Sequence, residues 1–215
     1  MEKRGPLCVL ACYVLWGVMP AFWKLLADVD SLYVLATRIV WSMVLTGGAL
    51  LWRRDRLAGV RAVLREKREW LLLAAAGCAI TVNWGVYIWA AGHGHMLDAS
   101  LAYYMNPILA ILLGTVVFRE KLTALQWLAA AVTLTGLVIA VVRWGQLPWI
   151  ALVVGGSFAV YGALKKKVKS DAAVSTFMET LTVSPLALIA IFWMDARGAG
   201  AVGVLEGWQW LLLPA

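Results

Sequence analysis

Long apolar stretches alternate with short polar segments along the whole chain. Each stretch approaches the roughly 20 apolar residues that a helix needs to cross about 30 Å of hydrocarbon. Seven such stretches occupy residues 6–26, 31–52, 70–92, 98–118, 124–142, 148–164 and 172–194. The pattern predicts an all-α protein, a polytopic bundle of transmembrane helices.

The apolar stretches at the two ends of the sequence need separate arguments as membrane spans. The stretch from Trp208 to Ala215 is too short to cross a bilayer, so we expect the sequence to be truncated within an eighth span. Lys3 and Arg4 precede the first stretch, as in a signal peptide. That stretch is longer than the roughly 7–15 residues of a signal peptide's apolar region, and no clear cleavage site follows. We expect an uncleaved first span.

Composition narrows the class of protein. Of 215 residues, 63% are hydrophobic and 14% are charged, and the mean hydropathy is +0.81. Soluble domains are about half apolar and about a quarter charged, so a disordered chain and an ordinary cytosolic enzyme are excluded. Cys8, Cys12 and Cys78 are odd in number, lie in apolar stretches and form no C-x-x-C pair. A disulfide framework or a zinc site is therefore not expected.

The basic residues predict an orientation. The net charge is +7, and 15 of the 19 lysines and arginines lie in the N-terminal tail and in loops 53–68, 119–121 and 165–169. Arg143 and Arg197 lie in loops on the other side. By the positive-inside rule we expect a multi-pass membrane protein whose N-terminus is cytoplasmic. Because the charge lies between spans, it indicates topology and no nucleic-acid partner.

The sequence also matches itself at an offset of 141 residues. The matching pairs are Lys24 and Lys165, Asp30 and Asp171, Arg38 and Glu179, and Trp52 and Trp193. One unit contains five spans, an odd number, so the second copy must be inverted. We expect a five-helix repeat at residues 1–143 and an incomplete inverted repeat at 144–215. Inverted repeats are typical of secondary transporters, whose site lies near the midplane between the repeats.

Two charged residues lie deep within predicted spans. Arg38 is about seven residues into its span, roughly 10 Å at 1.5 Å per residue, and Glu179 is equally deep from the other side. Such residues usually face a cavity or a partner. The pair is interpreted either as the polar centre of a site for solute or a proton, or as a structural ion pair, with snorkelling of Arg38 as a further alternative.

Aromatic and amide side chains supply further candidates for solute binding. They are Trp16, Asn83, Trp84, Tyr87, Tyr103 and Asn106, and Lys24 is added with snorkelling as its alternative. For any one of the others, the alternative is hydrogen bonding between helices. His95 and Asp98 join Glu179 as proton-coupling candidates, although a solvated turn would also explain them. No ATP-binding, hydrolase or dinucleotide motif occurs, so neither ATP-driven pumping nor a cofactor is expected. His93 and His95 have no further close ligands, so no metal site is expected there.

With these residues in view, the chain resembles the RarD-type branch of the EamA-domain drug/metabolite transporter superfamily. The resemblance runs in order through Leu15-Trp16-Gly17, Phe22-Trp23-Lys24, Arg38 to Ser42, Asn83-Trp84, Tyr87 to Ala90, His95 to Leu101, Tyr103, Asn106-Pro107, Gln126 to Ala129, Ser157 to Ala159, Tyr161-Gly162 and Glu179-Thr180. It implies ten helices in two inverted five-helix repeats in the cytoplasmic (inner) membrane, and small-molecule export linked to chloramphenicol sensitivity. Thr37, Tyr33 and Asp98 depart from the family's usual residues at their positions.

We therefore expect a secondary transporter that exports small organic solutes, metabolites or drugs by alternating access, and not an enzyme. The alternatives are a non-transporting membrane scaffold or subunit and, third, a membrane-bound enzyme. The expected partners are a small-molecule solute and the lipid bilayer, and a homodimer is left open.

Overall fold

The structure is a computed structural model that describes residues 4–52, 57–119, 121–145, 148–201, 204–205, 207 and 209–213. These residues form helices and no strand, which confirms the all-α fold. The α-helices are α1 (Arg4–Lys24), α2 (Ser31–Trp52), α3 (Leu57–Arg65), α4 (Lys67–Gly92), α5 (Met96–Phe118), α6 (Ala124–Trp144), α7 (Trp149–Lys165) and α8 (Ala172–Ala196). The segment predicted to begin an eighth span contains a short 3₁₀ helix, η2 (Gln209–Leu212).

Each of the seven predicted spans coincides with a helix. The helices differ in how many consecutive apolar residues the structure describes in them. By length and composition, four helices of the described part are able to cross a membrane: Ser31–Trp52, Lys67–Gly92, Ala124–Arg143 and Ala172–Ala196. The other three predicted spans contain the shorter apolar helical stretches Gly5–Met19, Ile108–Val117 and Trp149–Lys165. The polytopic helical bundle is therefore confirmed, and these three remain predictions as membrane spans.

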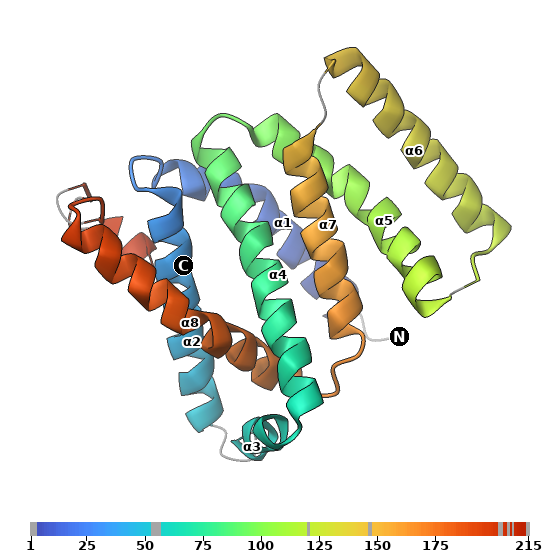
Figure 1. Ribbon diagram of the computed structural model, residues 1–215. Helices are drawn as coiled ribbons and strands as arrows, with labels where there is room; N and C mark the ends of the chain where they lie inside the picture. Colours follow the sequence, from blue (N-terminus) through green and yellow to red (C-terminus); the bar gives the residue numbers. More distant parts are fainter. Residues whose placement is uncertain are drawn as a thin grey trace.

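Helix α4 lies at the centre of the bundle, with α7 along one side and α8 along another (Figure 1). Helix α2 packs on α8 and α5 packs on α7, while α6 lies at the edge against α5. Apolar side chains cover α6 almost all round, and Leu125, Val132 and Val142 are largely exposed. An exposed helix that is apolar on every side fits a lipid environment.

Local sequence explains where α2 begins and where α6 begins and ends. The Asp30 carboxylate accepts a hydrogen bond from the backbone N–H of Leu32 at 2.8 Å, at the start of α2. Helix α6 begins with a capping box between Thr123 and Gln126 and ends at Gly145, whose φ of 68° suits glycine. These caps satisfy backbone groups that the helix itself leaves unpaired.

Helix α3 was not predicted, because the sequence suggested only a basic loop over residues 53–68. One side of α3 is apolar, and Val63 is buried in a cluster with Leu50, Leu73 and Met178. Its arginines Arg61 and Arg65 are exposed. Helix α3 and the connection between α7 and α8 lie at the same end of the bundle, which we call the basic end.

Candidate functional site

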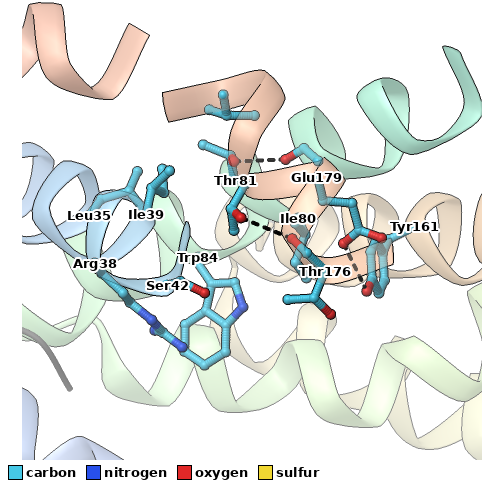
Figure 2. Close-up of a pocket in the computed structure, with 13 residues that line it drawn as sticks. Leu35, Arg38, Ile39, Ser42, Ile80, Thr81, Trp84, Tyr161, Thr176 and Glu179 are labelled. Atoms are coloured by element: carbon cyan, nitrogen blue, oxygen red, sulfur yellow. Dashed lines mark hydrogen bonds between the residues drawn. The ribbon is translucent and has the colours of Figure 1, made fainter. Parts of the chain in front are cut away.

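Helices α2, α4, α7 and α8 line a cavity of about 180 Å³, the central cavity (Figure 2). Among its described lining residues, Arg38 and Glu179 carry formal charges. The remaining ones are Leu35, Ile39, Ser42, Gly77, Ile80, Thr81, Trp84, Tyr161, Thr176, Thr180 and Val183. The structure thus brings the two deeply placed charges of the sequence analysis into one small space.

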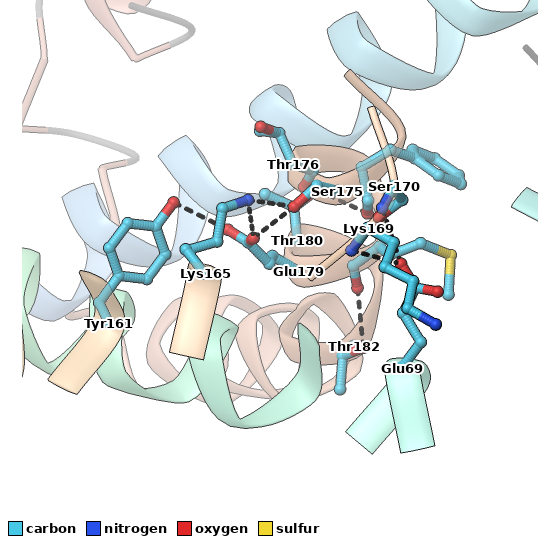
Figure 3. Close-up of polar contacts among 12 residues, drawn as sticks. Glu69, Tyr161, Lys165, Lys169, Ser170, Ser175, Thr176, Glu179, Thr180 and Thr182 are labelled. Carbon is cyan, nitrogen blue, oxygen red and sulfur yellow. Dashed lines mark hydrogen bonds and ion pairs between the residues drawn. The ribbon is translucent and has the colours of Figure 1, made fainter. Parts of the chain in front are cut away.

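The carboxylate of Glu179 is buried and held by three side chains. Its Oε1 lies 2.7 Å from Nζ of Lys165 in an ion pair, and it accepts a hydrogen bond from Oγ of Ser175 at 2.9 Å. The Tyr161 hydroxyl donates to Oε2 at 3.4 Å. Lys165 also donates to Oγ of Ser175, so the four groups form a closed network (Figure 3). A buried carboxylate is tolerated when it is both paired and hydrogen-bonded, as it is here.

Arg38 projects from α2 onto the face of Trp84, with the guanidinium carbon 3.8 Å from the ring centroid (Figure 2). A guanidinium at this distance is attracted by the negative face of an indole. The stacking fixes the arginine at the wall of the central cavity. Arg38 therefore points inward from α2, whereas the cation paired with Glu179 is Lys165.

Close contact between α4 and α8 sets the position of Glu179. A Cβ atom added to Gly77 on α4 would lie 2.8 Å from the backbone oxygen of Glu179 and 3.2 Å from its Cα. A side chain larger than hydrogen would therefore separate the two helices. Glycine at residue 77 permits the backbone approach that places the Glu179 carboxylate beside the central cavity.

A second cavity, of about 600 Å³, adjoins the first and is called the aromatic cavity. Its described lining residues are Tyr13, Trp16, Gly17, Asn83, Trp84, Tyr87, Met96, Ser100, Ala102, Asn106, Val154 and Phe158. Trp84 lines both cavities and makes an edge-to-face contact with Tyr87, with ring centroids 5.8 Å apart. Trp16, Asn83, Trp84, Tyr87 and Asn106, all predicted from sequence, meet in this one space.

Asn83 has a structural contact in addition to its place in the cavity wall. Its Nδ2 donates to the backbone oxygen of Val154 at 2.6 Å and to Oγ of Ser157 at 3.2 Å. These bonds join α4 to α7. Asn83 thus makes the hydrogen bonds between helices that the sequence analysis gave as the alternative to solute binding. Tyr103 belongs to α5, but its side chain lies outside the described part of the structure.

Lys24, His95 and Asp98 lie away from the central cavity. Lys24 is exposed at the end of α1 and is not among the described lining residues of either cavity. His95 Nδ1 lies 3.0 Å from Asp98 Oδ2 at the start of α5, and both side chains are partly exposed. Within the described ranges no three metal-ligating side chains come together.

Lys165 is the functional candidate that sequence reasoning missed. It was counted among the loop lysines because it begins a basic run at the end of a predicted span. The structure turns its side chain back toward Glu179, leaving 26% of that side chain exposed. The available signal was the repeat itself, because Lys24 and Lys165 each precede their deep charge by 14 residues.

The sequence model of the EamA-like transporter family matches residues 3–142. The chain belongs to this family. Family membership and the four helices of membrane-crossing length make it a multi-pass membrane protein of a transporter family. Relatives named RarD confirm the RarD-type branch that the sequence motifs indicated.

Three relatives illustrate the similarity. The uncharacterized transporter YojE of Bacillus subtilis is 36% identical over 98% of this chain and 71% of its own length. Protein RarD of Streptomyces exfoliatus is 38% identical over 92% of this chain and 62% of its own. The chloramphenicol-sensitive protein RarD of Pseudomonas aeruginosa is 33% identical over 100% and 72%. The chain thus spans about two thirds of the length of the curated relatives it matches. No solved structure is significantly similar to it.

Proposed function

We propose that this protein is a secondary transporter that exports small organic solutes across the cytoplasmic membrane by alternating access, without ATP. The observation that carries the proposal is the central cavity, where Arg38 and Glu179 place opposite charges inside a membrane bundle. Ionisable residues within membrane spans mark solute and ion pathways. The adjoining aromatic cavity offers rings and amides suited to an amphiphilic solute.

The proposed orientation places the N-terminus and the basic end in the cytoplasm. Helix α3 and the Lys166–Lys169 segment contribute much of the chain's positive charge at this end. Exposed lysines and arginines are retained on the cytoplasmic side of membranes. Solute export then runs from the basic end toward the end that carries His93 and His95, and Glu179 is the proton-coupling candidate that lies along this path.

The proposed repeats, residues 1–143 and 144–215, give α2 and α8 equivalent positions. Contacts between α2 and α8 are among the most extensive in the bundle, as expected for equivalent helices that meet near a pseudo-two-fold axis. Arg38 and Glu179 lie on these two helices. The solute site would thus lie at the interface of the repeats, and the proposed partners are a small organic solute and the lipid bilayer.

Flux through sealed proteoliposomes tests the proposal. Liposomes containing the full-length protein are preloaded with radiolabelled chloramphenicol, chosen because one relative is named chloramphenicol-sensitive, or with a bacterial small-molecule extract read by mass spectrometry. We expect at least one solute to leave these liposomes faster than it leaves preloaded liposomes without the protein. Glu179→Gln should abolish this flux while preserving membrane insertion, because the site loses its anion.

The matched control is Glu66→Gln, which removes a carboxylate that is exposed at the start of α4. This control should transport as the unmodified protein does. Wild-type flux in Glu179→Gln would remove Glu179 from the site. Absence of flux for every solute would favour a non-transporting scaffold, and product formation in detergent would favour a membrane-bound enzyme.

A further inference from the structure

The network around Glu179 lies toward the basic end of the bundle. Lys165 is the last residue of α7, and its ammonium reaches back to the carboxylate of Glu179 on α8. The Tyr161 ring lies beside this ammonium, with its centroid 5.8 Å from Nζ. Ser175 completes the set by accepting from Lys165 and donating to Glu179. The network thus bridges α7 and α8 next to their connection.

A second polar contact holds the same connection from the other side. The buried Glu69 on the first turn of α4 accepts hydrogen bonds from the backbone N–H groups of Lys169 at 3.2 Å and Ser170 at 2.8 Å (Figure 3). The segment between α7 and α8 is therefore fixed to α4 as well as to its own flanking helices. At the basic end, polar contacts thus hold the connection to α4, α7 and α8, beside the apolar cluster around Val63.

The opposite side of the central cavity is different. Leu35 lines the central cavity and also lines a third cavity of about 630 Å³ that includes Asp28, Asp30 and His93. An apolar side chain that is shared by two cavities makes no directional bond, and it moves at lower cost than a buried ion pair does. The ion pair on one side of the central cavity thus contrasts with the apolar side chain of Leu35 on the other.

We propose that Lys165 is a positioning residue of the transport site and closes the central cavity at the basic end by holding Glu179. This inference rests on the proposed function and deepens it. Opening at the basic end requires Nζ of Lys165 to leave the carboxylate, and closing restores the ion pair. Lys165 acts through Glu179, so its removal alters access to the cavity from one side of the membrane.

Cysteine accessibility tests the closure without any solute. Ser42 lines the central cavity, and Ser42→Cys is placed in full-length protein whose Cys8, Cys12 and Cys78 are replaced by serine. A membrane-impermeant, negatively charged methanethiosulfonate is added to one face of sealed vesicles at a time. A separate Ala58→Cys variant, exposed on α3, identifies the face that carries the basic end.

We expect Lys165→Met to raise the labelling rate from the basic end at least tenfold. Lys165→Arg, which keeps the cation, should remain near the unmodified rate. The matched control is Lys167→Met, because Lys167 is exposed in the same connection and its loss removes the same charge. Labelling from the opposite face should not rise in any of these variants.

Lys165→Met leaves a buried carboxylate without its counter-ion, so the double variant Lys165→Met with Glu179→Gln provides a version that carries no unpaired buried charge at this place. It should be labelled from the basic end as fast as Lys165→Met. If the double variant is labelled from the basic end only as fast as the unmodified protein, the proposal is overturned. Increased labelling of these variants, together with absence of solute flux by the unmodified protein, would uphold the closure and refute the transport function, so the two failures are distinguishable.

Discussion

Gly77→Ala is a direct test of the contact between α4 and α8. The added methyl group would lie 2.8 Å from the backbone oxygen of Glu179, whereas ordinary van der Waals contact begins at 3.4 Å. The two backbones would have to separate by about 0.6 Å to accommodate it. The obstructing atom belongs to the backbone of a helix, so it is unable to move aside as a flexible side chain would.

The expected magnitude follows from two opposing effects. Overpacking a close contact costs about 1–3 kcal/mol, while alanine is favoured over glycine within a helix by about 1 kcal/mol. The matched control is Gly48→Ala on α2, where a Cβ atom meets nothing within 4 Å. Because both variants gain the same helix propensity, the difference between them isolates the contact and should be about 1–3 kcal/mol.

The assay is thermal unfolding of the purified protein in detergent, followed by tryptophan fluorescence, with all three proteins at equal concentration. Gly77→Ala should unfold several degrees below Gly48→Ala, and Gly48→Ala at or above the unmodified protein. Equal unfolding temperatures for the two variants would show that α4 and α8 do not meet at Gly77, and the placement of Glu179 would then be wrong.

Three further predictions concern single side chains. Asn83→Ala should destabilise the bundle by about 1 kcal/mol in the same unfolding assay, because the bonds from α4 to α7 are lost, while Asn106→Ala should have a smaller effect. Arg38→Lys keeps the charge but loses the planar stack on Trp84, so solute flux should fall several-fold; full flux in this variant would mean that the charge alone suffices. Glu69→Ala should speed hydrogen exchange at the Lys169 and Ser170 amides at least tenfold, measured by mass spectrometry, because these N–H groups lose their acceptor.

Much of the fold was predictable because a membrane imposes a length on apolar helices. The stretch 31–52 coincides with α2, and the stretch 172–194 ends two residues before α8 does. Helix α3 was missed because it has nine residues and only one apolar side. Its charges made residues 53–68 resemble a basic loop. Its existence depends on burying Val63 against three other helices, which no local pattern reveals.

The candidate site was predictable only in part. Arg38 and Glu179 were conspicuous because charges are rare at that depth, and the structure places both beside one cavity. The pairing of Glu179 with Lys165 was not predictable, since the lysine lies at the end of its helix and could equally have pointed to solvent. Which of two cations meets a carboxylate depends on how the helices cross, and Gly77 makes that crossing close.

The position of Trp84 between the two cavities has a consequence for the size of acceptable solutes. Pockets for drug-sized ligands span about 300–1,000 Å³, so the central cavity at about 180 Å³ is too small for one and the aromatic cavity at about 600 Å³ is not. A bulky solute would keep its body among the rings and present only a small head group to the charges. A smaller residue at this position would merge the two compartments, so one side chain controls how large a molecule can approach Arg38 and Glu179. Specificity in such a bundle could diversify by exchange of a single wall residue, with the helices and their charges unchanged.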